Sequence, residues 1–316
     1  MRAIVAQRSG ARKGLDRGRA ARQHALVQQR VLILANPIAG GGRSKRLAPQ
    51  LADALRARGV DAQVYLTQRA GDAGARARAT AGEGFDALIA VGGDGTLNEV
   101  LNGMPDPSVP LGVLPVGTAN VLACELRIPK DPVRLAELIA SRHTREHAIG
   151  VANGRRFLLF CGAGLDAAIV EEVARTRTGT LGKWKWLPSI FRIVVRWPLP
   201  RLRATFADGS SIDNLSSVLV TRVRNYGGVA QLPKGIDPAS PQLFVLCFSA
   251  RSRIVWAWLG LRAALGLLSP CRWLTMRAAS EVQIEGTAPM QIDGDFAGST
   301  SAKVTLHAAR ANLFAP

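Results

Sequence analysis

The sequence predicts an α/β N-terminal region built on a parallel sheet, followed by a β-rich, sandwich-like C-terminal region. Three observations lead to this fold class. Apolar runs alternate with helix-like segments from about residue 31 to 148, and three of those runs end in glycine-rich turns. After residue 148, short strand-like segments are separated by Gly, Asp, Asn, Pro and Ser, as in antiparallel sheets. The 316 residues are enough for two regions with separate cores.

The first region alternates strands and helices in chain order. Apolar runs predict the strands, and Leu, Val and Ala at spacings of three and four predict the helices. The expected strands are residues 31–35, 60–67, 85–93 and 109–117, and the expected helices are residues 47–55, 70–84, 97–104 and 119–126. Strands that alternate with helices in this way form a parallel sheet covered on both faces.

The second region contains seven further strand candidates. They are residues 155–164, 202–212, 216–228, 242–249, 280–286, 289–295 and 302–309. We expect a nucleotide-binding domain at residues 31–148 and a β-rich domain at residues 149–304, with residues from about 305 to 316 able to return to the first domain. The active site is expected in the cleft between the two domains.

A formal net charge of +18 predicts attraction to anions such as nucleic acid, anionic lipid or phosphorylated ligands. The arginine usage of a GC-rich genome is an alternative source of part of this excess. Residues 1–30 carry eight basic side chains and one acid, Asp16. We expect a disordered basic arm there, with a mitochondrial presequence as the alternative. No nucleic-acid-binding motif is present, so nucleic acid is not an expected partner.

Two segments, residues 180–203 and 254–274, combine tryptophans with arginines or lysines. Indoles beside cations are favoured at membrane–water interfaces, although neither segment is long enough to span a bilayer. The alternative is a core helix with solvated charges. The four cysteines lack the spacing of metal ligands, which favours reduced thiols. We therefore expect a cytoplasmic protein that associates peripherally with an anionic membrane surface.

The stretch AVGGDGTLNEVLNG at residues 90–103 predicts a phosphate site. A helix N-terminus binds anions through its free N–H groups, and glycines let a ligand approach the backbone closely. The glycines here are Gly92, Gly93 and Gly95, and Thr96 could cap the helix or bind a phosphate oxygen. Asp94 beside a phosphate is explained by an intervening Mg²⁺ or a water network. Asn98 and Glu99 could add polar contacts, while the alternative for the whole turn is a tight strand-to-helix connection.

Two more glycine turns follow expected strands, at residues 36–42 (NPIAGGG) and 114–120 (LPVGTAN). Ligands of parallel sheets bind outside the carboxyl ends of the strands. The three turns are therefore expected to converge on one pocket.

Six motifs, taken in order, resemble the diacylglycerol kinase catalytic family, in the branch of soluble bacterial lipid kinases that is similar to sphingosine and ceramide kinases. They are NPIAGGG, TQRAGDA at residues 67–73, GGDGTLNEVLNG, LPVGTAN, GAGLDA at residues 162–167 and DGD at residues 293–295. The Gly-Gly-Asp-Gly-Thr stretch alone is shared with NAD kinases. An NAD-kinase-like enzyme is therefore the alternative.

The resemblance implies an ATP-dependent lipid kinase that phosphorylates a hydroxyl of diacylglycerol, a sphingoid base or a related lipid. It implies ATP and Mg²⁺ at the first domain, with Asp94 holding the metal directly or through water. The implied nucleotide-binding residues are Asn36, Pro37, Gly40, Thr67, Gly92, Gly93, Asp94, Gly95, Thr96, Leu97, Asn98, Glu99 and Thr118. The lipid is expected between the domains. Oligomeric state is left open, with a homodimer as one option.

The chain departs from the family's pattern in two places. The family usually ends its last motif in glutamate, the proposed general base, whereas Asp295 stands here. Asp94 and Asp295 are thus the expected catalytic carboxylates, and Asp293 is expected to form a turn. Pro241 and Gln242 replace an acidic stretch that forms an auxiliary metal site in some members, so we expect no such site. These departures leave a catalytically silent binding protein as a further alternative.

Overall fold

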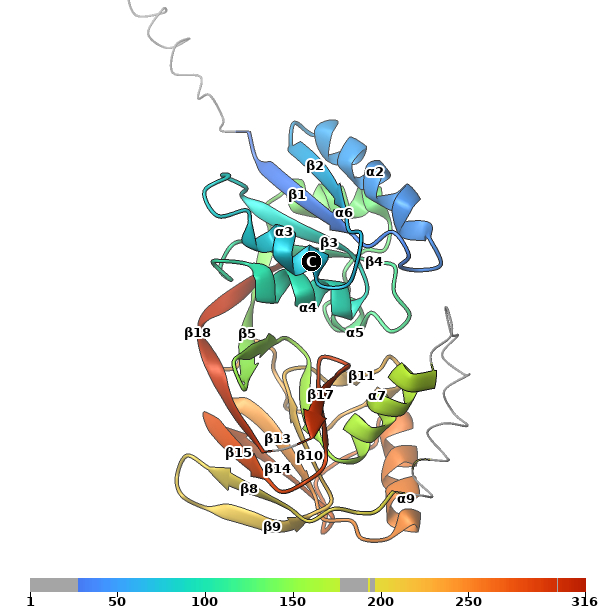
Figure 1. The fold of residues 1–316 in the computed structure, drawn as a ribbon, viewed down its shortest axis with the longest axis vertical. Helices are drawn as coiled ribbons and strands as arrows, with labels where there is room; N and C mark the ends of the chain where they lie inside the picture. The colour runs from blue at the N-terminus through green and yellow to red at the C-terminus, as the bar shows by residue number, and fades with distance from the viewer. Residues whose placement is uncertain (1–27, 177–192, 194–196, 300) are drawn as a thin grey trace, which may run out of the picture.

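The computed structural model describes residues 28–176, 193, 197–299 and 301–316. These residues form two lobes, an upper α/β lobe and a lower β-rich lobe in the view of Figure 1. The expected basic arm, up to residue 27, and most of segment 180–203 lie outside the described residues. The predicted fold class, an N-terminal α/β part followed by a β-rich part, is confirmed.

The upper lobe is built on four parallel strands. β1 (Arg30–Ala35) pairs with β2 (Asp61–Leu66) on one side and with β3 (Ala87–Gly92) on the other, and β3 pairs with β4 (Leu111–Pro115). Every residue of β3 and β4 is buried, as expected of strands covered on both faces. The carboxyl ends of all four strands therefore meet at one edge of the sheet.

Helices cover both faces of this sheet. α2 (Arg43–Arg56) packs with α6 (Pro132–Ala140), and α3 (Asp72–Arg78) packs with α4 (Asp94–Gly103). In the strand order β2-β1-β3-β4, the connection from β1 to β2 runs in one direction across the sheet. The connections from β2 to β3 and from β3 to β4 run in the opposite direction. Right-handed crossovers then put α2 on one face and α3 and α4 on the other. α4 follows β3 and α5 (Val121–Glu125) follows β4, so both helices begin at the carboxyl edge of the sheet.

The long strand β18 (Ala302–Phe314) connects the lobes (Figure 1). It runs antiparallel to β5 (Thr144–Ala152), which in turn pairs with β6 (Arg155–Phe157). Near its end Leu313 pairs in parallel with Leu111 of β4, and its beginning pairs with β15 (Glu281–Glu285). The upper sheet therefore continues through β18 and β15 into β8 (Leu202–Phe206) and β9 (Ser211–Leu215) of the lower lobe.

The lower lobe completes a sandwich with a second, antiparallel sheet. Its order is β14 (Leu274–Ala279), β13 (Leu243–Phe248), β10 (Ser217–Thr221), β7 (Phe160–Ala163), β16 (Pro289–Ile292) and β17 (Asp295–Ser299). Buried side chains of both layers, such as Val282 of β15 and Val218 of β10, form one hydrophobic core. The hairpin of β11 (Asn225–Tyr226) and β12 (Ala230–Gln231) contacts α5 of the upper lobe.

Two helices lie outside this second sheet, α7 (Leu165–Thr176) and α9 (Arg253–Ala264). The segment expected to be helical or interfacial at residues 254–274 is helical in its first half, while residues 265–273 form turns before β14. Among the described residues, none of the helices combines the length and hydropathy needed to cross a bilayer.

Glycine allows α3 and α4 to approach each other at backbone distance. A Cβ on Gly103 would overlap the carbonyl oxygen of Gly74, and one on Gly74 would lie 2.9 Å from the carbonyl oxygen of Glu99. The last glycine of the LNG sequence in α4 therefore serves helix packing, and it fixes the angle at which α4 leaves the sheet.

We predict that Gly103→Ala lowers the free energy of unfolding by about 1–3 kcal/mol, because the added methyl group pushes two backbones apart. The matched control is Gly260→Ala in α9, where an added Cβ meets nothing within 4 Å. This change should raise the free energy of unfolding by about 0.5–1 kcal/mol through helix propensity alone. Urea unfolding compares the two variants, and an equal response would contradict the packing role of Gly103.

Candidate functional site

The three glycine turns lie together at the carboxyl edge of the parallel strands. A Cβ on Gly40 would overlap the carbonyl oxygen of Val116, so the first turn packs directly on the third. A Cβ on Gly93 would lie 3.3 Å from Cα of Gly117, so the second turn also contacts the third. The structure therefore brings residues 36–42, 92–96 and 116–120 into one cluster, which we call the loop cluster.

The N-terminus of α4 faces this cluster without a side-chain cap. Gly93 is the N-cap residue in extended conformation, and the described residues show no side-chain hydrogen bond that caps the helix. Uncapped N–H groups and the helix dipole favour an anion here. The Thr96 side chain is buried and folds back over Gly92, where a Cβ would overlap it. Gly92 is thus required by Thr96 itself, while Gly93 and Gly95 remain at the exposed end of the helix.

The Asp94 carboxylate joins two helix N-termini. Its Oδ2 accepts the N–H of Val121 at 3.0 Å and its Oδ1 accepts that of Leu122 at 3.3 Å, both in the first turn of α5. Burial raises the pKa of Asp94, and these backbone hydrogen bonds oppose the shift. Nearby, Oδ1 of Asn120 is buried without a hydrogen-bond partner. This acceptor leaves a place for a donor from a ligand or from water.

The donor set around Asp94 suits one kind of metal site. The described residues contain no group of three His, Cys, Asp or Glu side chains that could enclose a metal ion. Mg²⁺ commonly keeps several waters and uses one or two carboxylates together with substrate phosphates. The hydrogen bonds from Val121 and Leu122 use one lone pair on each Asp94 oxygen. The residues therefore fit a Mg²⁺ that arrives with phosphates, and they do not form an all-protein cage.

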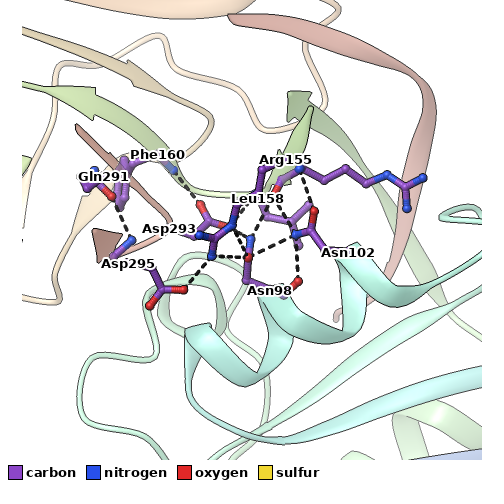
Figure 2. A network of polar contacts seen from close by, with 10 residues as sticks. Asn98, Asn102, Arg155, Leu158, Phe160, Gln291, Asp293 and Asp295 are labelled. Carbon is purple, nitrogen blue, oxygen red and sulfur yellow. Dashed lines mark hydrogen bonds and ion pairs between the residues drawn. The ribbon is translucent and has the colours of Figure 1, made fainter. Parts of the chain in front are cut away.

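Asp293 of the lower lobe is the most fully bonded carboxylate of the site (Figure 2). Its oxygens accept the backbone N–H groups of Leu158, Leu159 and Phe160 at 2.8–3.0 Å and the side-chain amide of Asn98 at 2.8 Å. Burial raises its pKa to about 6 despite these donors. Asp293 does lie in a turn, at φ 50°, but it also bonds β7 and α4 directly. Its role is therefore larger than the turn predicted from the sequence.

Asn98, which was expected to contact the nucleotide, bonds the lower lobe instead. Its amide nitrogen also donates to the carbonyl of Arg156, and its Oδ1 accepts from the Arg155 guanidinium at 2.9 Å. The side chain is only 2% exposed, so little of it can reach a ligand. Asn98 therefore acts as a link between α4 and β6.

Asp295, the expected base, projects toward the N-terminus of α4. Its Oδ1 would lie 4.0 Å from a Cβ on Gly95, and its Oδ2 accepts a hydrogen bond from Arg155 at 2.6 Å. Half of the Asp295 side chain is exposed, at 51%. The carboxylate is thus accessible to a group that approaches from solvent. Figure 2 shows Arg155 lying between Asp295 and Asn98.

A second set of hydrogen bonds supports the turn that carries Asp295. The side-chain oxygen of Gln291 accepts the N–H of Gly294 at 2.9 Å, and its amide nitrogen donates to Asp166 at 3.1 Å. Asp166 lies in the first turn of α7, and burial raises its pKa to about 6. The Asp166 side chain is thus held by Gln291 and by the Ser217 hydroxyl, 3.4 Å away.

The remaining sequence-predicted residues lie either at the carboxyl edge of the sheet or on α4. Asn36, Pro37 and Thr118 are partly exposed in the loop cluster, and Thr67 follows β2 beside β1 at the same edge. Leu97 is a core residue, so it can offer a ligand only its backbone. Glu99 is half-buried on α4, one turn beyond the helix start.

Arg155 is the functional candidate that sequence reasoning missed. The segment RRF was recognised only as part of a strand. Its pair of arginines beside an apolar run was the available signal, but nothing local says which arginine faces the cleft. Arg156 donates to the carbonyls of Leu101 and Met104 at the end of α4, whereas Arg155 bonds Asp295.

Known proteins are similar to this chain in sequence and in fold. Residues 30–152 match the family described as "Diacylglycerol kinase catalytic domain". Proteins named diacylglycerol kinase from Staphylococcus aureus strains RF122 / ET3-1 and JH9 are 33% identical over 180 residues. This match covers 56% of the chain and 56% of each relative, so the chain aligns with little more than half of their length.

Solved structures extend the similarity of fold. The crystal structure titled as a diacylglycerol kinase from Bacillus anthracis has a TM-score of 0.70 at 20% identity, covering 92% of this chain and 97% of that one. A second structure from the same strain has a TM-score of 0.75 at 23% identity over the same shares. The resemblance to the family is confirmed over residues 30–152, and it does not favour the NAD-kinase-like alternative.

We predict that Asp293→Asn lowers the free energy of unfolding by about 2–4 kcal/mol, because the amide group turns a donor toward backbone N–H groups and leaves at least one unpaired. Asp106→Asn is the control. Asp106 accepts the N–H of exposed Ser108 with one oxygen, a role that asparagine can fill, so its change should stay within about 0.5 kcal/mol. Urea unfolding followed by tryptophan fluorescence measures both, and equal small effects would contradict the role of Asp293.

Proposed function

We propose that this chain, whose residues 30–152 belong to the diacylglycerol kinase catalytic family, is an ATP-dependent lipid kinase. It would transfer the γ-phosphate of ATP to a hydroxyl of diacylglycerol, a sphingoid base or a related lipid. One observation supports this function above the others. The uncapped start of α4 lies in the loop cluster and faces an accessible carboxylate, Asp295, from the opposite lobe.

In this proposal the upper lobe binds the nucleotide, with residues 31–148 and the final strand from about residue 305 as its domain. Residues 149–304 form the domain that holds the lipid. The phosphates would lie against the N–H groups of Gly93, Asp94 and Gly95, where the helix dipole favours negative charge. Asn36, Pro37, Gly40, Thr67 and Thr118 would line the rest of the nucleotide site.

Asp94 is the residue that would hold Mg²⁺, directly or through water. When bound, the cation neutralises charge on the phosphates and keeps them in line for transfer. Asp94 also connects α4 to α5 through its backbone contacts. The same side chain would thus order the loop cluster and bind the cation.

Asp295 would accept the proton of the lipid hydroxyl as the hydroxyl oxygen attacks the γ-phosphorus of ATP. Its side chain is one methylene shorter than glutamate, so the hydroxyl must approach closely or act through one water. Arg155 would hold Asp295 in position and place a cation beside the phosphoryl group during transfer. Asn98 orients the guanidinium through its buried oxygen.

The lipid acceptor implies contact with a membrane, so we propose peripheral association with an anionic membrane surface in the cytoplasm. A homodimer is compatible with the same chemistry.

The direct test incubates the purified protein with Mg²⁺ and ATP labelled at the γ-phosphate, together with dioleoylglycerol, sphinganine or monooleoylglycerol in detergent micelles. We expect label in at least one lipid. We expect Asp295→Asn to lower kcat by about 10²–10⁴-fold, as loss of a general base does. Asp295→Glu should retain activity, and Asp208→Asn on an exposed turn is the control. Unchanged turnover in Asp295→Asn would remove this residue as the base.

We further predict that Arg155→Gln lowers kcat by about 10–100-fold, because a charge near the transferring group is lost. KM for ATP should change less, since the backbone N–H groups still bind the phosphates. Arg203→Gln is the matched control, because Arg203 pairs with exposed Asp213 in the far β8–β9 hairpin. A rise in KM with no loss of kcat would assign Arg155 to ground-state binding instead.

A further inference from the structure

Helix α9 exposes an apolar stripe on the surface of the lower lobe. On its inner side Leu259 is buried, and Trp256 packs on Phe248 with ring centroids 5.0 Å apart. Its outer side carries Ile254, Trp258, Leu261 and Leu265, which are 81%, 38%, 58% and 63% exposed. These four positions recur at intervals of four, three and four residues, so they share one face. Helices that are apolar on both sides are normally covered on both.

The sequence segment that carries the α9 stripe is basic. Residues 250–280 contain five arginines and no acid. Two of these arginines lie over indole rings, Arg262 over Trp258 at 4.8 Å and Arg272 over Trp273 at 3.9 Å. Indoles with neighbouring cations suit the boundary between lipid headgroups and acyl chains. An anionic lipid surface is therefore complementary to this face in both hydrophobicity and charge.

The stripe extends toward the boundary between the lobes. Beyond α9, Leu267 is 59% exposed, and a Cβ on Gly266 would lie 3.9 Å from Gln231 of β12. The β11–β12 hairpin carries exposed Val229 and is bonded to the upper lobe, because Glu125 accepts the N–H of Asn225 at 2.8 Å. A surface that covers the stripe would thus also lie next to the junction of the lobes.

We propose that the α9 stripe docks this protein on an anionic lipid bilayer, with Ile254, Leu261 and Leu265 inserted among the headgroups and the arginines held at the surface. The proposal rests on the lipid kinase function and adds the face that meets the membrane. A second copy of the chain fits less well, because two stripes face to face would bring like charges together with no acid in the segment to balance them.

Sedimentation with vesicles tests the docking without any nucleotide. The probe is vesicles of phosphatidylglycerol and phosphatidylcholine in equal parts, compared with vesicles of phosphatidylcholine alone. We expect the wild-type chain to sediment with the anionic vesicles and to be released as salt rises. The double variant Leu261→Asp, Leu265→Asp should bind at least about tenfold more weakly, because two inserted side chains are lost. Arg253→Gln with Arg262→Gln should weaken binding to the anionic vesicles alone.

The matched control is Val133→Asp, at a residue that is 49% exposed on α6 of the upper lobe. It should sediment like the wild type. The docking proposal is overturned if the wild type does not sediment with anionic vesicles, or if the double aspartate variant binds them as well as the wild type. It is also overturned if gel filtration shows a dimer for the wild type and a monomer for that variant.

A separate assay distinguishes failure of docking from failure of the proposed function. Dihexanoylglycerol, dispersed in water as single molecules, presents the hydroxyl without a bilayer. The double aspartate variant should phosphorylate it as fast as the wild type, and a matching loss there would overturn a purely docking role. Vesicle binding without phosphorylation of any lipid would uphold the docking surface and count against the kinase.

Discussion

The arrangement of the site depends on one buried carboxylate, that of Asp293. It accepts three backbone N–H groups from the segment that begins β7 and a fourth hydrogen bond from Asn98 of α4. Moving the lobes apart at this point would break the buried hydrogen bond from Asn98 and take one of four donors from the buried carboxylate, which is costly in a low-dielectric interior. The position of Asp295, two residues later, therefore follows from Asp293.

Backbone dipoles, more than cationic side chains, define the anion-binding face of the upper lobe. The start of α4 has no side-chain cap, and Asp94 caps the start of α5. Arg43, the first residue of α2 after the loop cluster's first turn, donates to the carbonyls of Gly40 and Val116. The cation nearest the expected base instead comes from the lower lobe, as Arg155. Charge compensation during phosphoryl transfer would thus require both lobes.

Much of the fold could be predicted because its signals are local. Buried parallel strands appear as apolar runs, and the three turns at their carboxyl ends appear as glycines. The network around Asp293 could not be predicted, because its partners are the backbone of residues 158–160 and the side chain of Asn98, far away in sequence. The structural roles of the glycines were also ambiguous in the sequence. Gly92, which was expected to serve the phosphate turn, makes room for Thr96, and Gly103 makes room for Gly74.

The position of β18 has a consequence for how the chain reaches this structure during synthesis. Asn312 donates to the carbonyl of Ser108, 204 positions earlier, and Leu313 pairs with Leu111 of β4. Until β18 has left the ribosome, the nascent upper sheet has β4 as an open edge. Pairing over such a separation is slow, and an unpaired edge strand is an aggregation hazard. Successful maturation would therefore favour conditions that shield β4 until β18 has been synthesised.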